Sequence, residues 1–223
     1  MNKTILEVSN VTKKVTSPEG ELTIVNDISL SLGEGVFASI LGPSGSGKTT
    51  LLAIMAGLDL PSSGSVKLLD KEITSLNEDK RAQIRSKDVG FVFQSFHLLP
   101  RLSALDNVMM PLEILGAKDA KERALKALDE VGLSKRTGHV PHQLSGGEKQ
   151  RVAIARAMVK APSILFADEP TGNLDQSSTD NILELLLGIN KQTKTTLVVV
   201  THDQQLASRS DMVFELQEGK LKC

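Results

Sequence analysis

Hydrophobic and polar positions follow two different periods along the chain, which separates strand-like from helix-like stretches. Residues 5–41 alternate or run apolar between turn signals at 17–20 and 33–35, so they predict strands in an antiparallel opening. From about 103 to 160 the apolar residues recur at helical spacing. Strand and helix patterns alternate again beyond 164, with a helix expected at 181–189 and a strand at 196–200. Such alternation is typical of parallel strands joined by crossovers.

Shorter signals complete this picture and predict an α/β fold. A helix is expected at 48–57, a turn at 61–64, and strands at 65–69 and 89–93. The pattern predicts one domain over residues 1–223. Its α/β core comprises 1–94, which includes an N-terminal antiparallel β part, and 161–223, with a helical subdomain inserted at 95–160.

Composition excludes several function classes. No apolar stretch of the 223 residues approaches the ~18 needed to span a bilayer, and the start Met1-Asn2-Lys3-Thr4 is too polar for a signal peptide. The 26 basic and 27 acidic residues give a net charge of −1, and the absence of Trp and Tyr leaves few platforms for base stacking. We therefore expect no nucleic-acid partner. The single cysteine, Cys223, excludes an internal disulfide and fits a reducing cytosol.

A phosphate-binding loop follows the apolar run at 36–41. Residues 42–49 match G-x-x-x-x-G-K-[ST] at every fixed position. In this motif backbone N–H groups cradle phosphate oxygens, Lys48 reaches the β- and γ-phosphates, and the Thr49 hydroxyl can bind Mg²⁺. A flexible Gly/Ser-rich turn is the alternative, but the strand before and the apolar helix after argue against it. The predicted phosphate-binding residues are Gly42, Ser44, Gly45, Ser46, Gly47, Lys48, Thr49 and Thr50.

An apolar run at 164–167 ends in the adjacent acids Asp168 and Glu169, followed by Pro170. Such a run is typical of a buried strand whose carboxyl end opens onto a ligand. Asp168 would hold Mg²⁺ through water, and Glu169 would orient or deprotonate an attacking water. Taken alone, a strand leaving the core through an acidic turn is the simpler interpretation; the phosphate loop upstream reverses that preference.

Ser145, Gly146, Gly147 and Glu148 open a predicted amphipathic helix. The S-x-x-E spacing is a capping box, which explains the Ser and the Glu without any ligand. A capping box does not require two glycines between its partners. Because glycines allow a phosphate to approach the amides of a helix start, the segment also predicts a second anion site.

Together these motifs resemble an ATP-binding cassette (ABC) ATPase over essentially the full chain. The resemblance implies a P-loop NTPase fold with a RecA-like core, and it implies ATP and Mg²⁺ as ligands. Segment 42–49 is then the Walker A loop, Gln94 the Q-loop glutamine, and segment 144–148 the signature. Segment 168–169 is the end of Walker B, segment 173–175, which ends in Asp175, is the D-loop, and His202 is the switch histidine. Lys48, Glu169 and His202 take the catalytic roles, and Thr49, Gln94 and Asp168 the contacts to Mg²⁺.

The same resemblance implies a head-to-tail homodimer in which each ATP lies between one chain's Walker A loop and the other's signature. Segments 89–100 and 104–108 resemble a bacterial subgroup of macrolide-exporter and lipoprotein-releasing ATPases, which includes a member encoded beside a large permease. This implies an integral membrane permease as partner, and a place on the cytoplasmic face of the inner membrane. The loop residues Phe96, Leu98 and Leu99 are the expected partner surface. Many family members stack adenine on an aromatic residue, where this chain has Val15.

Three other functions use related motifs. A cell-division regulator of the same short type would engage a membrane protein without moving a substrate. ABC ATPases of DNA repair or translation carry large insertions for which 223 residues leave no room. A P-loop small-molecule kinase would not explain segment 144–148.

Overall fold

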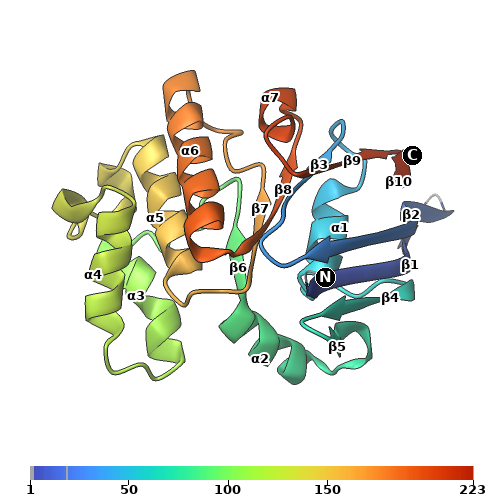
Figure 1. Cartoon of the computed structure of the whole chain (residues 1–223), viewed down its shortest axis with the longest axis horizontal. Helices are drawn as coiled ribbons and strands as arrows, with labels where there is room; N and C mark the ends of the chain where they lie inside the picture. Colours follow the sequence, from blue (N-terminus) through green and yellow to red (C-terminus); the bar gives the residue numbers. More distant parts are fainter. Residues whose placement is uncertain (1–2, 19, 223) are drawn as a thin grey trace. The chain divides into compact units, whose positions relative to one another are not determined.

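The computed structural model describes residues 3–18 and 20–222, so Met1, Asn2, Glu19 and Cys223 lie outside the described residues. The chain forms two compact units. The first comprises the residues up to Arg85 together with those from Thr196 onward, and the second comprises Ser86–Thr195. Figure 1 shows the elements of both units.

An antiparallel sheet forms the amino-terminal part of the first unit. Its strand order is β2-β1-β4-β5, with β1 at Thr4–Ser17, β2 at Gly20–Gly33, β4 at Ser63–Leu68 and β5 at Lys71–Glu72. Val8 of β1 pairs with Leu30 on one side and Val66 on the other, and all three are buried. Apolar cross-strand neighbours of this kind stabilise a sheet and fix its register.

The parallel strands of the first unit carry the elements that matter for the site. β3 (Phe37–Leu41) pairs in parallel with β8 (Thr196–Thr201) and β9 (Met212–Gln217), and β10 (Lys220–Lys222) pairs antiparallel with β9. Every residue of β8 is buried, as expected for a parallel strand covered on both faces. Helix α1 (Lys48–Met55) contacts β2, β4 and β8, and the short α7 (Gln204–Ala207) contacts β3 and β8.

The second unit contains the parallel pair β6 (Val89–Val92) and β7 (Ile164–Asp168) with four helices. These are α3 (Ala104–Ile114), α4 (Ala120–Glu130), α5 (Gly146–Met158) and α6 (Gln176–Thr193). Helices α3, α4 and α5 share one apolar cluster that includes the fully buried Val108, Leu128 and Val152. Single-turn 3₁₀ helices occur at Ile73–Ser75, in the first unit, and at Ser134–Arg136 and Pro141–Gln143 in the second.

The structure confirms the α/β class, and two of its differences from the sequence prediction concern the helices α6 and α2. Helix α6 extends beyond the predicted 181–189 at both ends, because Asp175 caps it and its first turn is polar. Helix α2 (Glu78–Asp88) gives no apolar period, since Ile84 is its only buried residue. Among the helices of residues 3–18 and 20–222, none combines the length and apolar character that a membrane span requires.

Candidate functional site

The loop between β3 and α1 has the backbone shape that phosphate binding requires. Gly45 and Gly47 have φ angles of 81° and 97°, which only glycine adopts without strain. Lys48, only 5% exposed, donates from Nζ to the carbonyl oxygens of Gly42 and Pro43, both at 2.8 Å. The buried Ser46 hydroxyl finds no hydrogen-bond partner among the described residues. A buried cation and an unsatisfied hydroxyl within one turn of a helix start fit an anionic ligand.

Neighbouring backbone holds this loop in place. A Cβ added at Gly47 would lie 2.6 Å from the carbonyl oxygen of Ile24 in β2, so no side chain fits there. The amide of Gly219, in the turn between β9 and β10, donates to the carbonyl oxygen of Ser46 at 3.2 Å, and Asn26 donates to Gly219 at 2.8 Å. The loop is thus positioned before any ligand binds, which lowers the ordering cost of binding.

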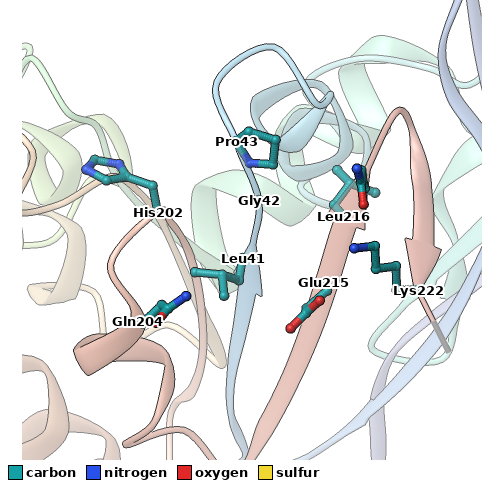
Figure 2. Close-up of a pocket in the computed structure, with 9 residues that line it drawn as sticks. Leu41, Gly42, Pro43, His202, Gln204, Glu215, Leu216 and Lys222 are labelled. Atoms are coloured by element: carbon teal, nitrogen blue, oxygen red, sulfur yellow. The ribbon is translucent and has the colours of Figure 1, made fainter.

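His202 lies at the same end of the first unit as the phosphate loop. It follows β8, whose Thr201 pairs with Leu41 of β3, and it lines a pocket of about 290 Å³ together with Gly42 and Pro43. Figure 2 shows His202 on one side of the β3 end, and Leu216 and Lys222 on the other. The next residue, Asp203, caps α7 through its Oδ1 and so fixes where the histidine leaves the strand.

Val15 forms part of an apolar pair. It is half-buried and pairs directly with Leu22 of β2, which is 58% exposed. Leu22 is two residues from Ile24, the residue against the phosphate loop, and a β-bulge in the pairing with β1 falls at Ile24. Leu22, which the sequence analysis did not single out, adds apolar surface next to the proposed adenine position.

In the second unit, Gln94 and Glu169 lie close together around Gly172. A Cβ added at Gly172 would lie 3.1 Å from Nε2 of Gln94 and 3.3 Å from Oε2 of Glu169. Asn173 Nδ2 also donates to the carbonyl oxygen of Gln94 at 3.0 Å. Glu169 has a φ of 43°, a conformation that costs a non-glycine residue about 1–3 kcal/mol and is common where function dictates the backbone. Asp168 ends β7 immediately before this turn.

The predicted signature segment forms the expected capping box. Ser145 Oγ accepts from the Glu148 amide at 3.2 Å, and the Ser145 amide donates to Glu148 Oε2 at 2.8 Å. The bond from the Ser145 amide, together with that from Arg136 Nε at 2.9 Å, lowers the pKa of the Glu148 carboxyl. The two glycines allow close packing, because a Cβ at Gly146 would lie 3.3 Å from Leu174 and one at Gly147 would lie 3.0 Å from Ser178 Oγ. Helix packing is therefore one sufficient reason for both glycines.

Asp175, the predicted D-loop residue, caps helix α6. Its carboxylate accepts from the Ser178 amide at 2.9 Å and from the hydroxyls of Ser177 and Ser178. These hydrogen bonds lower the pKa of Asp175 to about 2. The start of α6 therefore carries a negative charge at its amino end, where the helix dipole stabilises it.

The loop from Gln94 to Leu99 has a strained but well-held backbone. Phe96 and His97 have φ angles of 61° and 46°, each costing about 1–3 kcal/mol for a side-chain-bearing residue. Arg156 of α5 donates from Nη2 to the carbonyl oxygen of Phe96 at 2.9 Å and from Nη1 to that of His97 at 2.6 Å. Hydrogen bonds from a charged donor contribute about 1.5–3 kcal/mol each, enough to offset this strain. Burial lowers the pKa of the Arg156 guanidinium.

The predicted partner residues of this loop differ in exposure. Leu99 is 40% exposed and Phe96 is half-buried, whereas Leu98 packs against the apolar cluster of α3, α4 and α5. The completely buried Asn107 holds the loop further along, because its Oδ1 accepts from the Leu99 amide at 2.8 Å. Its Nδ2 donates to the carbonyl oxygens of Leu99, Leu102 and Ser103.

Comparison with known proteins places this arrangement in a family. The model of the ABC transporter family matches residues 25–172, more than half of the chain. The chain is similar to the lipoprotein-releasing system ATP-binding protein LolD of Legionella pneumophila strain Paris, with 47% identity over 223 residues covering 99% of this chain and 98% of that protein. It is 49% identical over 220 residues to the uncharacterised ABC transporter ATP-binding protein YbbA of Escherichia coli K12, covering 98% and 96%.

A longer relative and a solved structure agree with these matches. The chain is 44% identical over 216 residues to the macrolide export ATP-binding/permease protein MacB of Chlorobaculum tepidum, covering 96% of this chain and 33% of that protein. The dimeric ATP-binding cassette MJ0796 bound to ADP and Pi superposes with a TM-score of 0.91 at 39% identity, covering 98% and 97%.

The chain belongs to the ABC transporter family. Its activity class is ATP hydrolysis, with ATP and Mg²⁺ as the ligands that this family uses. The fit to a nucleotide rests on the molecule itself. The left-handed Gly45 and Gly47, the buried Lys48 ammonium and the unsatisfied Ser46 hydroxyl are suited to a polyphosphate.

Proposed function

We propose that this protein is the ATP-hydrolysing subunit that drives a separate transmembrane permease, acting as a head-to-tail homodimer with two composite sites. The observation that carries the proposal is that one chain holds both a braced phosphate loop at 42–49 and a glycine helix start at 145–148. A single nucleotide needs only one such site, so the second suits the partner's nucleotide. The relatives named as lipoprotein-releasing and macrolide-export proteins and the dimeric cassette support this assembly.

Each site residue then has a defined role. The backbone amides of 44–50 and the Lys48 ammonium bind the phosphates, and the Ser145 hydroxyl with the Gly146 and Gly147 amides binds the γ-phosphate of the partner's nucleotide. Glu169 accepts the proton of the attacking water, and His202 donates a hydrogen bond to the γ-phosphate. Val15 and Leu22 pack against the base. These assignments, with Asp175 between the protomers, rest on the motif spacing and the local geometry.

Mg²⁺ would be held by Thr49, Gln94 and Asp168, and when bound it neutralises phosphate charge and orients the scissile bond. Oxygen donors of this kind suit a hard cation. Asn173 would not bind the metal itself. It holds the backbone of Gln94 through its hydrogen bond to the Gln94 carbonyl oxygen.

We further propose one cassette domain, with an α/β core at 1–94 and 161–223 and a helical subdomain at 95–160. The helical subdomain offers Phe96 and Leu99 to the permease, with Leu98 packed beneath them. The assembly places the protein on the cytoplasmic face of the inner membrane, where the permease acts in export or in mechanical transmission. The alternative is a cell-division complex that uses the same ATPase without transporting a substrate.

Isolation of the tagged chain from native membranes tests the proposal. We expect a multi-spanning protein to co-purify in a ratio of one permease assembly to two ATPase chains. Recovery with a cell-wall hydrolase regulator would favour the alternative. Recovery only from the soluble fraction, with no membrane protein, would contradict both.

A further inference from the structure

Arg156 connects the helix that follows the predicted signature with the loop that follows Gln94, two segments with different proposed roles in the ATPase. It lies in the last turn of α5, the helix that begins at the signature, and its guanidinium bonds to the loop that begins at Gln94. A helix of this length spans about 20 Å. The amino end of α5 therefore carries Ser145, Gly146 and Gly147, and its carboxyl end grips the partner-facing loop.

Arg156 bonds to the two residues of the loop whose backbone is strained. Phe96 and His97 are consecutive residues with positive φ, and each presents its carbonyl oxygen to one Nη atom of Arg156. The amides of these two residues bond to nearby carbonyls, from Phe96 to the Phe93 carbonyl and from His97 to the Ser95 carbonyl. The His97 ring also makes a T-shaped contact with the ring of Phe93. Two fixed donors on a planar group match two carbonyls better than one ammonium would.

We propose that Arg156 is a positioning residue that makes the signature helix and the loop Gln94–Leu99 move as one body. Through this residue, a nucleotide bound at the start of α5 changes the position of Phe96 and Leu99, and a partner held at the loop changes the position of the signature. The inference rests on the proposed function, which assigns nucleotide binding to the start of α5 and partner binding to the loop Gln94–Leu99. The mechanical link itself rests on the hydrogen bonds of Arg156 alone.

A matched control is available on the same helix. Arg123 of α4 donates from Nη2 to the carbonyl oxygen of Val159, the residue that ends α5, at 2.9 Å. Arg123 thus supports the same helix end with the same chemical group, through its hydrogen bond to Val159 and its ion pair with Asp119. Removal of either arginine weakens α5, but only removal of Arg156 frees the loop.

Hydrogen–deuterium exchange on the full chain without nucleotide is the first test. In Arg156→Ala we expect the amides of Phe96 and His97 to exchange at least tenfold faster than in wild type, with Arg156→Lys in between. The amide of Leu99, held by Asn107, should change less. Arg123→Ala should leave segment 94–97 at the wild-type rate. Equal exchange of this segment in both alanine variants would overturn the proposal, because Arg156 would then only stabilise the helix.

The second test measures the coupling. In Glu169→Gln with ATP and Mg²⁺, we expect slower exchange both at 145–150 and at 95–97. Adding Arg156→Ala should leave the protection at 145–150 and abolish it at 95–97. Joint protection of both segments in the double variant would contradict the inference. If Glu169→Gln alone shows no protection at 145–150, the composite site fails instead, and the nucleotide-free test still decides the role of Arg156.

Discussion

Asn173 Nδ2 donates a hydrogen bond of 3.0 Å to the main-chain oxygen of Gln94, which joins the predicted D-loop to the predicted Q-loop inside the second unit. The bond leaves the Gln94 side-chain amide available for the proposed contact to Mg²⁺, while the backbone that carries it is held. Residues that orient a metal ligand from outside the coordination shell commonly affect metal affinity or activity by about 10–100-fold.

Asn173→Ala should therefore raise the Mg²⁺ concentration for half-maximal ATPase by about tenfold, with the KM for ATP at saturating Mg²⁺ within about twofold of wild type. Titration of steady-state ATPase with Mg²⁺ measures this. Asn190→Ala is a suitable control, since Asn190 Nδ2 also bonds a main-chain oxygen, that of Thr195, at 2.9 Å. A similar Mg²⁺ shift in both variants would show that the effect is general destabilisation.

Glu169→Gln should keep ATP binding and lower turnover by about 10²–10⁴, the usual contribution of a positioned base. Glutamine is isosteric and can keep the positive φ of 43° that Glu169 already adopts. Because hydrolysis normally separates the protomers, the variant should elute as a dimer with ATP and Mg²⁺ in size-exclusion chromatography. A variant that stays monomeric under these conditions would argue against the composite site.

Val15→Tyr should tighten ATP binding, because an aromatic ring on this strand can stack on adenine, which contributes about 1–3 kcal/mol for bases elsewhere. Wild type, with Val15 opposite Leu22, should discriminate ATP from GTP by less than about tenfold, or ~1.4 kcal/mol. Competition binding with the two nucleotides measures both effects. Stronger discrimination by wild type would mean that another residue reads the base.

Phe96→Ala combined with Leu99→Ala should abolish co-purification of the membrane partner while the thermal unfolding temperature stays close to wild type. The reason is that Leu99 is 40% exposed and Phe96 half-buried, so their loss removes contact surface more than core. Leu98→Ala is the contrasting variant, because Leu98 packs against the helical cluster and its truncation should lower the unfolding temperature. Retention of the partner by the double variant would place the docking surface elsewhere.

Asp175 should add a pH dependence to stability at the acidic end. Its pKa is about 2 in the folded protein, below the ordinary value of 3.8, so the carboxylate favours the folded state above about pH 4. That contribution is lost as the pH falls from about 4 towards 2. Asp175→Asn keeps a capping side chain but removes the titration. The unfolding temperatures of wild type and Asp175→Asn should therefore differ at pH 5 and approach each other as the pH falls to about 2; a constant difference across this range would contradict the assignment.

The sequence by itself determined the class of fold and the main chemical segments. Glycines at fixed spacing before Lys48 can form only a narrow set of backbone shapes, and apolar runs such as 36–41 and 196–200 are recognisable because parallel strands are buried on both faces. The Ser145–Glu148 box was readable for the same reason, since capping is a local interaction within one helical turn.

Only the tertiary structure showed which side chains hold these segments. Arg156, Asn107 and Asn173 act on backbone carbonyls 59–60, 4–8 and 79 residues away in sequence, respectively, and no local pattern marks such a bond. Leu98 packs against the helical cluster while Leu99 is 40% exposed, and both follow Phe96 and His97, whose positive φ angles are unusual for these residue types. The period of apolar residues predicts burial within helices and strands. It does not predict burial in a loop whose backbone is held by hydrogen bonds from side chains of other elements.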